Sequence, residues 1–144
     1  MTEPPAKHSL LIVDDSPVIV TRILEAVSVL LGEEGVAVAS SMSEALEYLK
    51  THHPDIVILD CNIAGESGFR VLNAIRSSGQ GTYVIAWSTD LNPITMRKYI
   101  EAGADSVLDK THEFEELLPH LRQSLTSRKV LKRSRSSRQQ SIRR

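Results

Sequence analysis

The chain has 144 residues, of which 41% are hydrophobic and 24% charged, and its formal net charge is −1. This length suits one domain plus a short appendage, and the apolar content argues against disorder throughout the chain. No apolar run approaches the roughly 20 residues that span a bilayer, no signal peptide is recognisable, and one cysteine excludes an intramolecular disulfide, so we expect a cytoplasmic protein without a membrane span.

Five short apolar runs predict strands: Leu10–Val13, Val36–Ala39, Ile56–Leu59, Tyr83–Trp87 and Val107–Leu108. The first and third runs are continuously apolar rather than alternating, which is typical of strands that are covered on both faces. A helical pattern follows each run, so strand and helix alternate five times. This alternation predicts an α/β fold, a doubly wound (βα)5 arrangement with a parallel five-stranded sheet.

The sequence also predicts several helix starts and the buried face of one helix. Ser16 before Pro17, Ser41 with Glu44 three residues later, and Asn92 before Pro93 are typical N-terminal caps. In the fourth helix, we expect Met96 and Ile100 to point inward. The last helix has the clearest apolar stripe, from Phe114 to Leu125, and Pro119 within it predicts a kink or a late helix start.

Charge is distributed unevenly between the body of the chain and its end. Residues 1–127 contain 18 acidic and nine basic side chains, a formal charge of −9, whereas residues 128–144 contain eight basic side chains and no acidic one. We expect one domain over 8–127 and a basic, flexible tail over 128–144. The tail is too short for a DNA-binding domain. Three interpretations of the tail remain open: a solvated end, a segment that binds an acidic protein surface, nucleic acid or an anionic membrane, and a homodimer contact through the last helix.

Polar side chains follow four of the predicted strands where each ends: Asp14-Asp15, Asp60, Ser88-Thr89 and Asp109-Lys110. Parallel strands place their carboxyl ends at one edge of the sheet, where ligands bind, so these side chains should meet there. One lysine offsets only one of three clustered carboxylates, and Mg²⁺ prefers such oxygen ligands. A carboxylate beside a bound cation can attack a phosphoryl donor and form an acyl phosphate.

Together these motifs resemble the response-regulator receiver domains of two-component signalling, over about residues 8–127. Gly68, eight residues after Asp60, and Ala102-Gly103-Ala104, seven residues before Lys110, add to the resemblance. It implies the flavodoxin-like strand order 2-1-3-4-5 and a phosphohistidine donor on a sensor histidine kinase or histidine phosphotransfer protein. The implied roles are phosphoacceptor for Asp60, magnesium ligands for Asp14, Asp15, Asp60 and the Asn62 backbone carbonyl, switch hydroxyl for Ser88, and phosphoryl-pairing ammonium for Lys110.

The chain departs from the family pattern at several positions. Thr111 replaces the usual proline after the lysine, which predicts a trans peptide bond and a more mobile loop. Val107 replaces the switch aromatic, and Ile63-Ala64 replaces a methionine-proline pair, so we expect an altered output switch. Thr89, where alanine is common, and Asp90 are candidates for tuning the attack of water on the acyl phosphate.

Three functions compete at this point. The first is a phosphorylation-dependent response regulator that acts by binding a downstream partner, with no enzymatic activity beyond its own phosphorylation and slow dephosphorylation. The second is a receiver-type adaptor that works without phosphorylation, or an intermediate in a phosphorelay. The third is an aspartate-dependent phosphohydrolase, which the sequence disfavours because such enzymes place a second acid two residues after the first, where this chain has Ser16.

Overall fold

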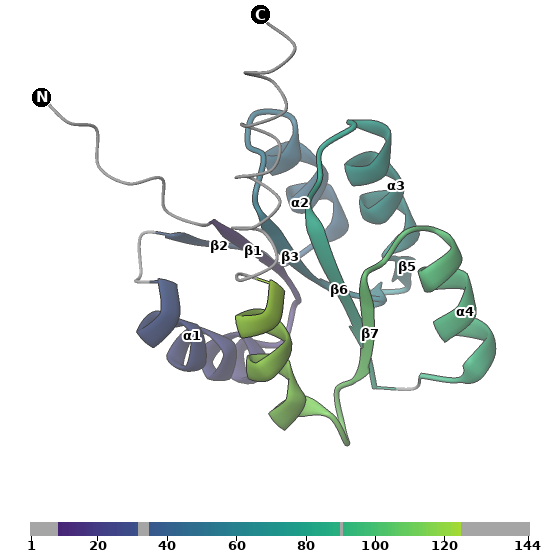
Figure 1. Cartoon of the computed structure of the whole chain (residues 1–144). Helices are drawn as coiled ribbons and strands as arrows, with labels where there is room; N and C mark the ends of the chain where they lie inside the picture. Colours follow the sequence, from purple (N-terminus) through teal and green to yellow (C-terminus); the bar gives the residue numbers. More distant parts are fainter. Residues whose placement is uncertain (1–8, 32–34, 90, 125–144) are drawn as a thin grey trace, which may run out of the picture.

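The computed structural model describes residues 9–31, 35–89 and 91–124. Its main strands are β1 (Leu10–Val13), β2 (Val36–Ala39), β3 (Ile56–Asp60), β6 (Tyr83–Ser88) and β7 (Ser106–Asp109). They pair in parallel in the order β2-β1-β3-β6-β7 (Figure 1). Counted along the chain this order is 2-1-3-4-5, so the predicted flavodoxin-like fold is confirmed.

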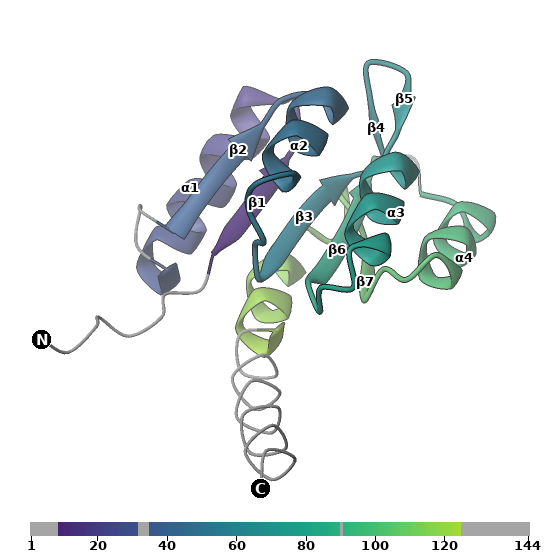
Figure 2. The ribbon, with the colours of Figure 1, turned by 90° about the horizontal axis from the view of Figure 1, so that it is seen from above.

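Helices cover both faces of this sheet, as Figures 1 and 2 show. One face carries α1 (Pro17–Leu31) and the helical residues 117–124, which follow the 3-10 helix η2 (Phe114–Glu116). The other face carries α2 (Met42–Leu49), α3 (Phe69–Ser77) and α4 (Pro93–Glu101). The three-layer arrangement leaves the carboxyl ends of the strands open at one edge.

Successive residues of the central strands point to opposite faces and build two separate cores. Leu11 and Val13 of β1 pack in the cluster under α2 and α3, whereas Leu10 and Ile12 pack in the cluster under α1. Every residue of β1 and of β3 is buried. The continuously apolar sequence of these strands is therefore explained by cover on both faces.

The predicted helix caps form, one of them in a shifted version. Ser41 Oγ accepts the Glu44 N–H at 3.0 Å, and the Asn92 side chain accepts the Thr95 N–H at 2.9 Å. In a standard capping box the Glu44 carboxylate would accept the N–H of the N-cap, Ser41. Here it accepts the N–H of Ser40, the preceding residue, at 2.9 Å. Both helices thus begin where the sequence predicts.

The prediction for the buried face of α4 is wrong. Met96 and Ile100 are 41% and 48% exposed, whereas Tyr99 is only 1% exposed. Tyr99 stacks on Phe69 of α3 with ring centroids 4.2 Å apart, and its hydroxyl reaches the loop after β3. The burial of this aromatic side chain and its two contacts account for the rotation of the helix.

The last helix starts late, as Pro119 predicts. Residues 114–116 form the 3-10 turn and α-helical geometry begins at 117, so Pro119 falls in the first turn, where its missing N–H needs no partner. Leu125 and the basic tail lie outside the described residues. Of the helices in the described segments, none combines the length and the apolar character that crossing a bilayer requires.

A small antiparallel hairpin after β3 was not predicted. It pairs β4 (Asn62–Ile63) with β5 (Glu66–Ser67), and it projects from the same edge of the sheet as the strand ends (Figure 2). Ala64 and Gly65 at its tip have φ values of 53° and 82°, and the Asn62 side chain accepts the Gly65 N–H at 3.0 Å. The side-chain bond stabilises a turn in the left-handed region, which alanine adopts only at a cost.

Candidate functional site

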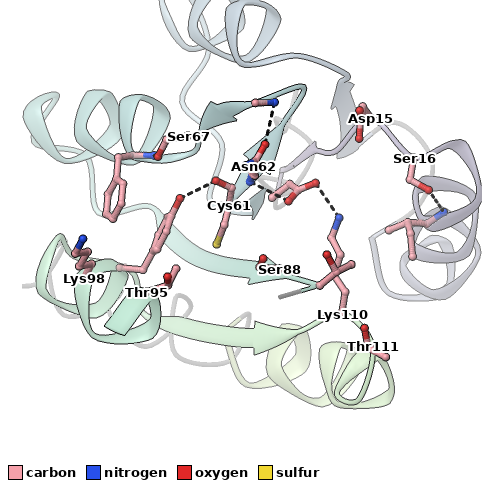
Figure 3. A pocket seen from close by; sticks show the side chains of 16 residues that line it. Asp15, Ser16, Cys61, Asn62, Ser67, Ser88, Thr95, Lys98, Lys110 and Thr111 are labelled. Carbon is pink, nitrogen blue, oxygen red and sulfur yellow. Dashed lines mark hydrogen bonds and ion pairs between the residues drawn. The ribbon is translucent and has the colours of Figure 1, made fainter. Parts of the chain in front are cut away.

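The polar residues that end the strands meet around one cleft of about 820 Å³ at the carboxyl edge of the sheet (Figure 3). Asp15 lines it from the end of β1, Asp60 from β3, Ser88 and Thr89 from β6, and Lys110 from β7. The backbone continues its sheet bonding just beyond the strands, since the Lys110 N–H donates to the Ser88 carbonyl at 2.9 Å. This bond fixes the start of the Lys110 side chain beside the cleft.

Three carboxylates gather on one side of the cleft. One oxygen each of Asp14, Asp15 and Asp60 lies within 4.8 Å of the other two. Asp14 and Asp60 are buried and Asp15 is exposed. Asp14 Oδ1 accepts the Ser16 N–H at 2.9 Å, which holds this carboxylate at the end of its strand.

Lys110 joins two of these carboxylates. Its Nζ lies 2.5 Å from Asp14 Oδ2 and 2.8 Å from Asp60 Oδ2, and its side chain is only 8% exposed. Burial alone would lower the pKa of the ammonium, but its ion pairs with Asp14 and Asp60 outweigh burial and raise that pKa. Lys110 therefore remains charged in this buried position.

Asp60 is held by a different donor at each carboxylate oxygen. Lys110 Nζ donates to Oδ2, and the Asn62 backbone N–H donates to Oδ1 at 3.1 Å. Burial raises the pKa of this carboxyl group, while the bonds from Lys110 and Asn62 oppose the rise. The carboxylate is thus fixed in orientation and less fully stabilised in its charged form than an exposed one.

The cluster has the composition of a site for a hard divalent cation. Three carboxylates and one ammonium carry a formal charge of −2 when all are ionised, so one divalent ion would neutralise them. The one sulfur ligand nearby, Cys61, is buried, and burial raises its pKa to about 12, so the thiol stays protonated. Oxygen ligands alone favour Mg²⁺ or Ca²⁺ over zinc.

Comparison with known proteins bears on these residues. A sequence model of the response regulator receiver domain matches residues 10–122. This chain belongs to that family. The transcriptional regulatory protein DltR of Streptococcus agalactiae is 32% identical over 115 residues, which are 78% of this chain and 50% of DltR. The nitrate/nitrite response regulator NarL of Escherichia coli K12 is 27% identical over 123 residues, 85% of this chain and 57% of NarL.

Solved receiver structures share the fold. The receiver domain of a putative LuxO repressor from Vibrio parahaemolyticus has a TM-score of 0.80 at 20% identity and covers 88% of this chain and 96% of its own. The chemotaxis protein CheY4 of Vibrio cholerae has a TM-score of 0.71 at 26% identity, with 83% and 99% covered. This receiver spans about half the length of the curated relatives it matches.

The acidic pocket of Asp14, Asp15 and Asp60 with Lys110 is typical of phosphoaccepting response regulators, and in receivers such an acidic triad binds a divalent metal. The receiver brings Ser88 to the same cleft, half-buried, and leaves Thr89 exposed at its rim. Asp90 lies outside the described residues. Val107 is partly buried in β7 and packs against the cluster under α2 and α3.

Glycine at position 68 has a steric reason in this receiver. The Gly68 N–H donates to the Cys61 carbonyl at 2.9 Å, which brings the start of α3 directly under the end of β3. A Cβ atom there would lie 2.7 Å from the Asp60 carbonyl oxygen and 3.0 Å from the Tyr99 hydroxyl. Any side chain would therefore displace the backbone that carries Asp60.

The loop that follows Lys110 is tied to the end of β7. All peptide bonds of the described segments are trans, including the one before Thr111, as predicted. The Thr111 N–H donates to the Asp109 carboxylate at 2.8 Å, and this bond lowers the pKa of Asp109. Asp109 therefore directs its carboxylate to the loop and does not belong to the acidic cluster.

Tyr99 is the main residue of the cleft whose contact the sequence did not reveal. Tyr99 lines the cleft from α4, and its hydroxyl donates to the Cys61 carbonyl at 3.0 Å. Figure 3 draws this bond as the dashed line that ends at Cys61. A tyrosine in a short amphipathic helix gives no signal for such a contact, because it depends on a loop 38 residues earlier.

Proposed function

We propose that this receiver accepts a phosphoryl group on Asp60 from the phosphohistidine of a sensor histidine kinase or histidine phosphotransfer protein, and then acts through partner binding. The observation that carries the proposal is the position of the Lys110 ammonium, 2.8 Å from Asp60 Oδ2 within the acidic cluster at the strand ends. Since the chain covers about half of its curated relatives, the downstream partner is not specified by them.

In this proposal, an oxygen of the Asp60 carboxylate attacks the phosphorus atom. The bond from phosphorus to the donor's imidazole nitrogen breaks, and the imidazole leaves with the electron pair while the acyl phosphate forms. Lys110 pairs with one oxygen of the transferred group, and the Ser88 hydroxyl donates to another. Both side chains line the same cleft as Asp60, which supports these roles.

We assign the magnesium ligands to Asp14, Asp15, Asp60 and the backbone carbonyl of Asn62, with Asp14 acting through a water molecule. A bound Mg²⁺ would neutralise the carboxylates and the equatorial phosphoryl oxygens. The exposure of Asp15 supports its part, because its carboxylate lines the cleft and pairs with no other side chain in the described segments.

The receiver would catalyse nothing beyond its own phosphorylation and slow dephosphorylation. Thr89 and Asp90 are our candidates for the residues that set the rate of dephosphorylation. A single buried thiol fits a reducing compartment, so we place the protein in the cytosol. We keep 8–127 as the receiver and 128–144 as a separate basic tail.

A second function is favoured by one observation. Val107, where receivers usually carry the switch aromatic, lies against the core as a small aliphatic side chain. This packing supports our expectation of an altered output switch, and with it an adaptor that works without phosphorylation or a phosphorelay intermediate. Val107→Tyr should change partner binding if this position takes part in output, and unchanged binding would exclude it.

The deciding experiment is incubation with Mg²⁺ and acetyl phosphate, followed by intact-protein mass spectrometry. We expect one added phosphoryl group in the unmodified protein, and none when EDTA is present during the incubation or when Asp60→Asn is used. The control variant Glu47→Gln, which changes an exposed acid of α2, should be labelled like the unmodified protein. The absence of labelling in the unmodified protein would leave the adaptor as the better account. Persistent labelling of Asp60→Asn would reject Asp60 as the acceptor in favour of another residue.

A further inference from the structure

Tyr99 connects the last turn of α4 to the loop that follows Asp60. Its side chain is almost fully buried, and its ring stacks on Phe69 at 4.2 Å. The hydroxyl donates to the Cys61 carbonyl oxygen at 3.0 Å, which also accepts the Gly68 N–H at 2.9 Å. This carbonyl is the first after the strand that carries Asp60.

The opposite end of the same peptide group contacts Asp60. The Cys61 carbonyl and the Asn62 N–H belong to one peptide unit, and that N–H donates to Asp60 Oδ1 at 3.1 Å. A continuous chain of hydrogen bonds thus runs from the phenol through one peptide to the carboxylate, and the Lys110 ammonium holds the other carboxylate oxygen.

Two physical effects couple the Tyr99 hydroxyl to Asp60 through this series of hydrogen bonds. The peptide group is planar, so fixing its carbonyl direction also fixes the direction of its N–H. A donor at the carbonyl also polarises the peptide and makes its N–H a stronger donor, because hydrogen bonds in series reinforce one another in a medium of low dielectric constant. Both effects hold Asp60 Oδ1 in place while Asp60 Oδ2 stays with Lys110.

We infer that Tyr99 is a positioning residue for phosphoryl transfer to Asp60, acting through the Cys61–Asn62 peptide group. The inference rests on the proposed function of Asp60 and adds a residue of α4 to the machinery of the cleft. Its distinctive element is the hydroxyl, since a residue that only packed against Phe69 and the core would serve equally well as phenylalanine.

Tyr99→Phe tests the hydroxyl alone. The ring and its stacking remain, and the Cys61 carbonyl keeps its bond from the Gly68 N–H, so the variant should fold. The matched control is Tyr83→Phe, which removes a hydroxyl bonded at 2.9 Å to Ser106, away from the cleft. Both variants lose one tyrosine hydrogen bond, and only one of those bonds leads to Asp60.

The first measurement is phosphorylation by acetyl phosphate with Mg²⁺, analysed as a maximal rate and a half-saturating donor concentration. We expect Tyr99→Phe to lower the maximal rate about three- to tenfold, the usual effect of one hydrogen bond, with the half-saturating concentration unchanged. Tyr83→Phe should match the unmodified protein. Equal maximal rates in all three proteins would overturn the inference.

The second measurement does not need phosphorylation. The amide proton of Asn62 should move upfield in the NMR spectrum of Tyr99→Phe, because its bond to Asp60 weakens, and should not move in Tyr83→Phe. If the unmodified protein is not phosphorylated, the proposed function fails, while this shift still decides whether the Tyr99 hydroxyl acts on the Asn62–Asp60 hydrogen bond. If Tyr99→Phe does not fold, Phe69→Leu, which loosens the stacked ring, should shift the same proton in the same direction, and no shift would reject the inference.

Discussion

Lys110 lies 2.8 Å from the carboxylate of Asp60, although 50 residues separate the two in the chain. The same ammonium pairs with Asp14 at 2.5 Å, so one cation holds two buried acids together. Removing the ammonium would leave two buried carboxylates without compensation, whereas removing the Asp60 charge leaves Lys110 paired with Asp14.

Lys110→Met should lower the free energy of unfolding by about 2–4 kcal/mol at pH 7, because two buried carboxylates then face each other without the ammonium. Mg²⁺ should recover part of the loss by taking its place. Urea unfolding followed by the fluorescence of Trp87, the single tryptophan, measures both effects. Lys50→Met, at an exposed ion pair with Glu47, should change stability by less than about 0.5 kcal/mol. Similar losses in the two variants would contradict this expectation.

Asp60→Asn should become more stable relative to the unmodified protein as the pH rises above 3.8, in the absence of metal. Burial raises the folded-state pKa of Asp60 above that ordinary value, so the folded state binds its proton more tightly than the unfolded state does. Ionisation of Asp60 therefore costs stability as the pH rises through this window, and asparagine does not ionise. Unfolding in urea with EDTA at pH 4 and pH 7 checks the trend, and a difference independent of pH would refute it.

Gly68→Ala should destabilise the domain by about 1–3 kcal/mol and slow phosphorylation, since its Cβ would lie 2.7 Å from the Asp60 carbonyl oxygen. Gly79→Ala is the matched control, because that position has a φ of 75° and open space around it. We expect the control to lose about 1 kcal/mol from backbone strain alone and to keep its phosphorylation rate. Thermal unfolding and acetyl phosphate labelling separate the two glycines, and equal labelling rates would contradict the steric argument.

The thiol of Cys61 should react very slowly with iodoacetamide in the folded protein. Burial raises its pKa to about 12, and the nearby Asp60 charge adds to the rise, so roughly one thiol in ten thousand is ionised at pH 8. In urea the same residue should be alkylated at the rate of a free cysteine. Mass spectrometry of the alkylated fraction over time gives both rates, and rapid labelling of the folded chain would show that the group is exposed.

The sequence predicts the sheet well because its strands coincide with short apolar runs, which are continuous in β1 and β3, the two strands that are buried on both faces. Leu10–Val13 and Val36–Ala39 were predicted to the residue, and Ile56–Leu59 falls one residue short of β3. The position of Asp60 and Lys110 in one cleft followed from the rule that parallel strands end at the same edge. Local pattern and a general rule of topology were sufficient for these features.

The rest depends on contacts between distant residues, which a local pattern does not contain. The rotation of α4 is set by Tyr99 meeting Phe69 and Cys61, residues 30 and 38 positions earlier, so the periodicity of Met96 and Ile100 was misleading. The β4–β5 hairpin consists of two residues per strand and has no apolar run. It is stabilised by the Asn62 side chain at a turn, a feature too short to stand out in sequence.

The α4 helix carries Ile94, Met96 and Ile100 on its solvent side and Tyr99 on its core side. A ligand that bound the aliphatic side and rotated the helix slightly would move the Tyr99 phenol. The Asn62 N–H, which donates to Asp60, would move with it. Thermodynamic linkage then requires reciprocity: whatever factor such a ligand applies to the phosphorylation equilibrium, phosphorylation applies to the ligand's affinity. A protein without an aromatic residue at position 107 would still be able to convey the state of its aspartate to the outer surface, through a helix instead of a strand.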